Sequence, residues 1–191
     1  MPIDDVRVIS NTSTGELGQR LAKELANKGA KVTVLEGPVT RPLKLSSVKI
    51  LKFRFFDELK KFLHQELKKK YDVVIHAAAV SDFQLKRAFT RKLESGSNLK
   101  LELVPTPKLI ESIKRKNPAV FLVGFKLESK LNANSAKRFA RDLFGKAKCD
   151  LVVVNSLSHE KYSAFLLNRE NKIVASAKTR ESLVKTLIQN L

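Results

Sequence analysis

Two hydrophobic periods alternate along this chain, and together they predict strands followed by helices. Short apolar or alternating runs indicate strands, whereas apolar residues three to four positions apart indicate amphipathic helices. The expected strands cover residues 6–9, 30–37, 48–53, 72–79, 99–104, 120–125, 151–155, 164–168 and 172–177. The expected helices cover residues 17–28, 56–70, 107–116, 133–148 and 180–191, and residues 80–99 are expected to be irregular.

Individual residues support these boundaries. Gly29 suits the C-terminal cap of the first helix, Pro107 suits the first position of the third, and Thr179 suits the N-cap of the last. The run 72–79 is apolar nearly throughout, which is typical of a strand buried on both faces of a sheet.

Strands that alternate with helices indicate a Rossmann-like, doubly wound α/β fold with a mostly parallel sheet. A hairpin around residues 169–171 and a closing helix complete the expected fold. No linker or internal repeat divides the sequence, so residues 1–191 are expected to form a single domain. Ligands of such sheets bind beyond the carboxyl ends of the strands. The loops expected at those ends are residues 11–18, 37–42, 77–99, 125–132 and 155–159.

The most informative of these loops is the glycine turn, residues 11–18, which reads NTSTGELG. The first N–H groups of a helix have no internal partner, and the helix dipole makes that end positive. Gly15 and Gly18 lack the Cβ atoms that would hold a phosphate away, while Ser13 and Thr14 add hydroxyl donors. The turn therefore predicts a site for the phosphates of a nucleotide, although many similar turns bind nothing.

Composition restricts the class of protein. Hydrophobic residues make up 43% of the chain, which suits a globular fold, and no apolar run approaches the length of a membrane span. The single cysteine, Cys149, excludes a disulfide framework and fits the reducing cytoplasm. The N-terminal residues MPIDDVR lack the apolar segment of a signal peptide. We expect a cytoplasmic protein without a membrane partner.

The formal net charge of +18 raises the question of nucleic-acid binding. The lysines are spread over helix faces and are not interleaved with aromatic residues, so a nucleic-acid partner is not expected. A small polyanionic substrate needs only a few of these cations. His64, His76, His159 and Cys149 have no metal-ligand spacing, so no protein-bound metal is expected.

One functional hypothesis is an NAD(P)-binding protein. The motif TSTGELG, the acidic Glu36 after the second strand, and VVIHAAA resemble short-chain dehydrogenases. That family requires a tyrosine and a lysine four residues apart. Here Tyr71 is followed at that spacing by Ile75, and Tyr162 by Leu166, so this hypothesis remains only an alternative.

A second hypothesis comes from six motifs that occur in register along nearly the whole chain. They are ISNTSTGELG (9–18), AAAVSDF (77–83), KLESG (92–96), LVPTPKLI (103–110), VGFKLE (123–128) and CDLVVVN (149–155). Together they resemble the phosphopantothenoylcysteine synthetase family, the synthetase half of the pantothenate-metabolism flavoproteins. The resemblance implies a ligase of coenzyme A biosynthesis that joins 4′-phosphopantothenate to cysteine with a nucleoside triphosphate.

The resemblance also implies roles for particular residues. Ser13, Gly15 and Gly18 match the triphosphate-binding turn of the family, and Asn11 matches an asparagine aimed at the acyl intermediate. The remaining nucleotide-binding positions are Asp82, Lys92, Pro107, Lys108, Leu109, Ile110, Phe125 and, in a less certain register, Lys146, with Asn155 as a weaker candidate. Lys92 would contact the phosphates and serve catalysis together with Asn11.

The family further implies CTP or ATP as co-substrate with Mg²⁺, with CTP favoured through an acyl-cytidylate that releases CMP and pyrophosphate. No flavin is expected, because the flavin domain of the fused proteins is not part of this sequence. A homodimer is expected from the family alone. Family members usually begin with a strand and a Gly-Gly-Thr turn, followed by a segment like PIDDVR. This sequence has the segment PIDDVR but not the strand and turn before it. A relic that binds nucleotide without turnover is therefore a further alternative.

Overall fold

The structure is a computed structural model that describes residues 1–87, 89–94, 96, 98–158 and 161–191. Its helices are α1 (Glu16–Asn27), α2 (Phe56–Glu66), α3 (Leu109–Lys116), α4 (Ala133–Asp142), the π-helix η1 (Leu143–Ala147) and α5 (Arg180–Ile188). Its strands are β1 (Thr33–Glu36), β2 (Lys49–Lys52), β3 (Val73–His76), β4 (Phe83–Leu85), β5 (Leu103–Pro105), β6 (Phe121–Glu128), β7 (Leu151–Ser158), β8 (Lys161–Asn168) and β9 (Ile173–Ala177).

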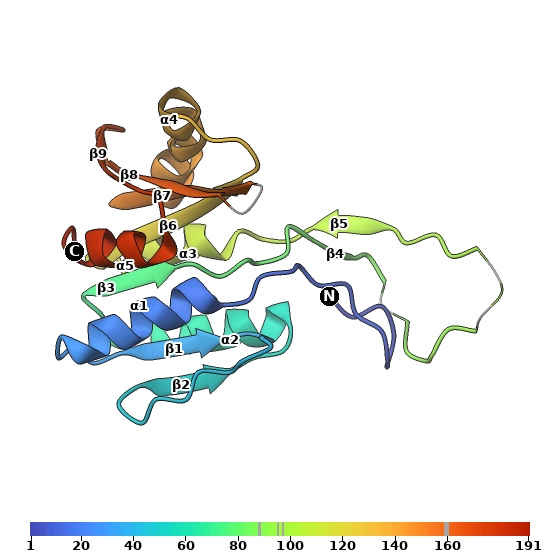
Figure 1. The fold of residues 1–191 in the computed structure, drawn as a ribbon. Coiled ribbons are helices and arrows are strands. Elements are labelled where there is room, and N and C mark those ends of the chain that lie inside the picture. Colours follow the sequence, from blue (N-terminus) through green and yellow to red (C-terminus); the bar gives the residue numbers. More distant parts are fainter. Residues whose placement is uncertain (88, 95, 97, 159–160) are drawn as a thin grey trace.

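The strands that the structure describes form three sheets, and their topology confirms the expected Rossmann-like α/β fold. The largest sheet has the order β3-β6-β7-β8-β9, parallel from β3 to β7 and antiparallel from β7 to β9. β1 and β2 pair in parallel, and β4 pairs with β5 in an antiparallel ladder. Figure 1 shows that the β4–β5 ladder projects away from the main sheet as an arm.

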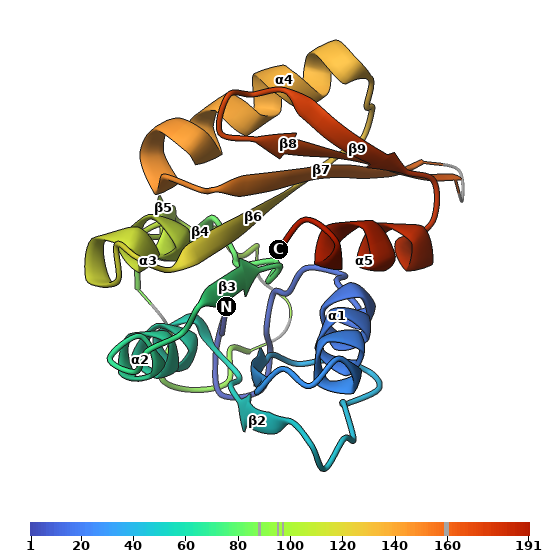
Figure 2. The same ribbon diagram turned by 90° about the vertical axis from the view of Figure 1, so that its left-hand side faces the viewer.

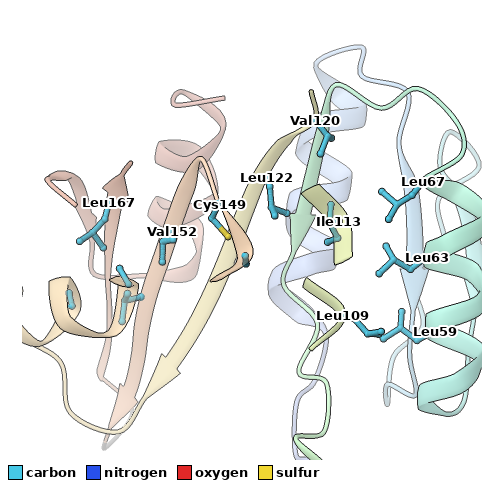
Figure 3. Close-up of a cluster of buried hydrophobic side chains, with 14 residues drawn as sticks. Leu59, Leu63, Leu67, Leu109, Ile113, Val120, Leu122, Cys149, Val152 and Leu167 are labelled. Atoms are coloured by element: carbon cyan, nitrogen blue, oxygen red, sulfur yellow. The ribbon is translucent and has the colours of Figure 1, made fainter. Parts of the chain in front are cut away.

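Helices cover both faces of the sheet because successive residues of a strand point to opposite sides. Leu122 of β6 and Val152 of β7 join the cluster that contains α2, α3 and α4. Their neighbours Val123 and Val153 join the second cluster, which contains α1 and α5. Figure 2 shows α1 and α5 on one side of the sheet, and Figure 3 shows Leu59 and Leu63 of α2 near Leu109 and Ile113 of α3.

Several local signals are confirmed. Thr179 and Ser182 form a capping box at the start of α5, with Ser182 N donating to Thr179 Oγ1 at 3.0 Å. Gly29 follows α1 with a φ of +86°, the left-handed conformation that favours glycine at a helix end. The expected hairpin around residues 169–171 joins β8 to β9.

The expected strand at residues 6–9 is wrong. Val6 is 64% exposed, and the segment makes a single isolated bridge between Pro2 and Val8. The cause is Asp4, whose Oδ1 accepts hydrogen bonds from the N–H groups of Val6 at 3.0 Å and Arg7 at 2.7 Å. This local turn supplies hydrogen-bond acceptors for these backbone N–H groups, so they do not need a neighbouring strand.

The strand at 72–79 forms as β3, but the prediction that it is buried on both faces is wrong. All four residues of β3 are partly exposed. β6 covers one edge of β3, and the described part of the chain forms no ladder on its other edge.

Other boundaries also differ from expectation, among them those near β4, α3 and η1. The segment 80–99 is not wholly irregular, because it contains β4, whose partner β5 spans fewer residues than the expected strand at 99–104. Pro107 lies two residues before α3 rather than inside it, and Lys108 takes the N-cap position. The helix expected at 133–148 changes after Asp142 into the π-helix η1, which ends before Lys148 in a left-handed conformation with a φ of +57°.

Candidate functional site

The glycine turn lies at the carboxyl end of the sheet and is joined to the loop that follows β3. Asn11 makes this connection, because its Nδ2 donates a hydrogen bond to the carbonyl oxygen of Ala79. The same side chain accepts a hydrogen bond from Ser13 N at 3.2 Å through its Oδ1. One amide therefore holds the shape of the turn and attaches it to a second loop.

The N-terminus of α1 is open to an anion. Its N-cap is Gly15, with a φ of +74°, and glycine has no side chain with which to cap the helix. A Cβ at Gly15 would lie 2.6 Å from Val39 Cγ1, whereas a Cβ at Gly18 would meet no atom within 4 Å. The close approach and the positive φ both require glycine at position 15, and the space at Gly18 leaves room beside the first helical turn.

The loop after β3 is connected to the start of α3. Asp82 forms an ion pair with Lys108, and both side chains are more than half exposed. Thr106 N donates to the carbonyl oxygen of Asp82 at 2.9 Å, and Thr106 Oγ1 donates to that of Ser81 at 2.6 Å. Thr106 thus fixes Asp82 and Lys108 beside each other.

The four remaining expected positions in this region differ in burial. Leu109 is buried and Ile110 is half-buried at the start of α3, so Leu109 can offer a ligand only its backbone groups. Phe125 lies in β6, is half-buried, and packs against the cluster that contains α1 and α5. Pro107 immediately precedes the N-cap residue Lys108.

Lys92 lies exposed on the arm, next to the N-terminal segment. Leu93 N donates to Asp4 Oδ2 at 3.1 Å, and Arg7 donates to the carbonyl oxygen of Leu93 at 2.8 Å. The Arg7 guanidinium holds the pKa of the Asp4 carboxyl well below its usual range. This ionised carboxylate ties the backbone next to Lys92 to the N-terminal segment. Ser95 of the KLESG motif and His159 lie outside the described residues.

Lys146 is not brought together with the other expected residues. It belongs to η1, which leads into the amino end of β7, and the glycine turn lies at the carboxyl end of the sheet. Its Nζ lies 3.5 Å from Asp142 Oδ1.

Two residues acquire roles that sequence reasoning missed. Thr106 positions Asp82. Its place between Pro105 and Pro107 was the one feature of the sequence that could have drawn attention to it. Glu36 is buried, and its Oε1 accepts hydrogen bonds from Gln19 Nε2 at 3.1 Å and Leu43 N at 2.8 Å. The carboxylate that a dehydrogenase would offer to a ribose is here engaged in holding the loop after β1.

His76 is the last residue of β3, at the carboxyl end of that strand. Burial lowers the pKa of its imidazole, which favours the neutral form.

Metal and membrane signals are absent from the described part of the chain. No group of three or more His, Cys, Asp or Glu side chains among these residues could hold a metal ion. None of the helices that the structure describes is long and apolar enough to cross a membrane.

Comparisons with known proteins agree with this architecture. The model of a family described as the DNA/pantothenate metabolism flavoprotein C-terminal domain matches residues 1–188. The coenzyme A biosynthesis bifunctional protein CoaBC of Thermococcus kodakarensis is 38% identical over 189 residues, covering 97% of this chain and 46% of that protein. The chain thus spans about half the length of the curated relatives that it matches.

Solved structures show the same fold. A DNA/pantothenate metabolism flavoprotein from Streptococcus pneumoniae superposes with a TM-score of 0.86 at 25% identity, covering 98% of this chain and 92% of that one. A Cab2 variant in complex with phosphopantothenate-cysteine has a TM-score of 0.81 at 18% identity, covering 99% of this chain and 82% of that one.

Proposed function

Because this chain belongs to the family of the DNA/pantothenate metabolism flavoprotein C-terminal domain, we propose that it catalyses the ligation of 4′-phosphopantothenate to cysteine. A nucleoside triphosphate would activate the carboxylate, with CTP favoured over ATP. The observation that carries this proposal is the junction made by Asn11, which joins an open helix N-terminus to the loop after β3.

The triphosphate is proposed to lie over the N-terminus of α1. The N–H groups of Leu17 and Gly18, together with Ser13 Oγ, would donate to phosphate oxygens, whereas Glu16 N donates to Thr14 Oγ1 at 3.4 Å. The glycines at positions 15 and 18 leave space for close approach. Lys92 would add a cation from the arm. Mg²⁺ would arrive bound to the triphosphate and neutralise its charge.

The nucleoside is proposed to bind between the loop after β3 and the start of α3. Asp82 and Lys108 offer an acceptor and donors at this place, and the backbone of residues 107–110 offers further groups. Phe125 would pack near the base. Lys146 is left out of the proposed site because it lies at the other end of the sheet.

The proposed reaction has two steps. A carboxylate oxygen of 4′-phosphopantothenate attacks the α-phosphorus of CTP, forming an acyl-cytidylate and releasing pyrophosphate. The amine of cysteine then attacks the acyl carbon, forming the amide, expelling CMP and giving up a proton. Asn11 can donate to the developing oxyanion through its Nδ2, so catalysis rests mainly on placement and charge neutralisation.

The proposal includes the setting of the enzyme. We place it in the cytoplasm, where the buried Cys149 thiol stays reduced, and we propose that it works as a homodimer.

Pyrophosphate release from CTP or ATP, with Mg²⁺ and with or without 4′-phosphopantothenate and cysteine, tests the proposal. We expect release that requires 4′-phosphopantothenate and accelerates with cysteine. Asn11→Ala and Lys92→Gln should each lower kcat by roughly 100-fold, the effect of removing one preorganised donor. The control Lys172→Gln removes an exposed lysine next to β9 and should not change kcat. Release of phosphate instead of pyrophosphate would contradict the acyl-cytidylate step, and saturable NAD(H) binding without ligation would contradict the ligase.

A further inference from the structure

A cavity of about 480 Å³ lies at the amino ends of β6 and β7, at the other end of the sheet from the proposed nucleotide site. Residues from α3, the segment between α3 and β6, η1, the segment before β7 and the β8–β9 turn line it: Lys114, Pro118, Phe144, Lys148, Cys149 and Arg169. The proposed ligase reaction uses none of these side chains.

Positive charge exceeds negative charge in this cavity. The nearest carboxylate, Asp150, is 7% exposed and accepts a hydrogen bond from Leu122 N at 2.7 Å. Its Oδ2 also lies 2.7 Å from Lys114 Nζ, and its Oδ1 pairs with Arg169. One carboxylate therefore faces two partner cations, and Lys148 adds a third positive charge.

Two of the cations keep donors available to a ligand. Arg169 is 66% exposed and, among the hydrogen bonds between described residues, donates one, from a single terminal nitrogen to Asp150. The exposed Lys148 has no ion pair with any residue that the structure describes. Burial and the neighbouring Arg169 lower the pKa of Lys114, which is the direction expected where positive charge is in excess.

Lys148 has a backbone conformation that is unusual for lysine. Its φ of +57° lies in the left-handed region, which glycine adopts more readily than lysine. It directly follows the π-helix, a form that is rare and often found at functional sites. Lys148 is the C-cap of η1, and its N–H donates to the carbonyl oxygen of Leu143, so the end of the helix fixes this backbone conformation. The same backbone holds the Lys148 side chain at the cavity, where no described residue pairs with its charge.

The rest of the cavity wall is uncharged. Phe144 and Pro118 supply apolar surface, and burial raises the pKa of the Cys149 thiol to about 12, so the thiol stays neutral. We propose that this cavity binds a phosphate monoester that carries a compact apolar group. The dianion would balance the two excess cations, and the apolar group would pack against Phe144 and Pro118.

Titration of the whole chain with phenyl phosphate, followed by backbone amide NMR, tests the proposal. We expect the amides of Phe144, Lys148, Cys149 and Arg169 to shift on one saturable curve. Inorganic phosphate should bind about fivefold more weakly because it lacks the apolar group. Equal affinities for the two probes, or shifts confined to residues 11–18, would overturn the proposal.

Variants separate binding from a structural role. Arg169→Gln and Lys148→Gln should each weaken phenyl phosphate binding about five- to tenfold, as expected for one charge-assisted hydrogen bond. Lys148→Gly should weaken binding equally while keeping or raising Tm, because it removes the charge and relieves the left-handed backbone. The control Lys185→Gln removes an exposed lysine of α5 and should leave the Kd unchanged. A Kd unchanged in Lys148→Gly and Arg169→Gln would overturn the proposal.

Discussion

Replacing Gly15 by alanine should affect both the stability of the fold and the binding of nucleotide. Gly15 holds a φ of +74°, and a left-handed conformation costs a residue with a Cβ roughly 1–2 kcal/mol. The new methyl group would also lie 2.6 Å from Val39 Cγ1, so either the turn or the loop carrying Val39 must move. Val39 is half-buried in a loop and can yield, so the total cost should be about 2 kcal/mol.

Thermal unfolding and steady-state kinetics measure the two effects. A loss of about 2 kcal/mol should lower Tm by roughly 4–8 °C in a chain of this size. Displacement of the turn should raise the KM for the nucleotide, because the N–H groups of α1 would no longer meet the phosphates at their proper positions. Cysteine KM should change less, since cysteine enters only the second step.

Double-mutant analysis separates the two causes. Val39→Ala removes Cγ1, so Gly15→Ala should cost less in the Val39→Ala background than in the wild type. Gly145→Ala serves as the matched control, because a Cβ at Gly145 would meet no atom within 4 Å and its φ is not positive. Unchanged Tm and nucleotide KM in Gly15→Ala would refute the reasoning about the turn, and additive effects with Val39→Ala would refute the steric part.

Three further predictions concern single side chains. Hydrogen bonds from Lys69, Tyr71 and Lys49 outweigh burial and lower the pKa of Glu66 from its usual 4.5 to about 2. Ionised Glu66 therefore stabilises the fold above pH 4.5, and this contribution is lost as the pH falls towards 2. Urea unfolding should show Glu66→Gln to be less stable by about 1–3 kcal/mol at pH 7, and a difference of the same size at pH 2 would contradict the assignment. Thr179→Ala removes the cap of α5 and should lower Tm by roughly 2–4 °C, or about 1 kcal/mol, whereas Thr179→Ser should not, as thermal melts would show. Asp82→Asn should raise the nucleotide KM about tenfold without changing Tm, because its ion pair with Lys108 is exposed; a change in Tm alone would indicate a structural role.

Local sequence patterns were enough to predict most helices and strands. The spacing of leucines marked α1 and α2, and Thr179 and Gly29 marked helix ends, because caps and amphipathic faces depend on residues close in the chain. The alternation of strands and helices likewise predicted the mostly parallel sheet. These features are local, so the tertiary structure changed them little.

Residues 6–9 and η1 show where local patterns fail. A β-branched run becomes a strand only when another strand offers its edge, and the Asp4 turn instead directs this segment towards Leu93, far away in the sequence. No period in the sequence distinguished the π-helix from the end of α4. In both cases the conformation of the segment depends on how it packs against distant parts of the chain, which is why the sequence alone did not predict it.

The candidate site divides in the same way. By itself, the sequence predicted the glycine turn, since a strand, a run of small residues and a helix start are close together in the chain, whereas the contact of Gly15 with Val39 belongs to the tertiary structure. Only the tertiary structure decided that Asn11 reaches Ala79, that Thr106 holds Asp82, and that Lys146 lies at the opposite end of the sheet. Hydrogen bonds between loops depend on how the strands are ordered and how helices return across the sheet, and that order is fixed by the burial of apolar faces over the whole chain.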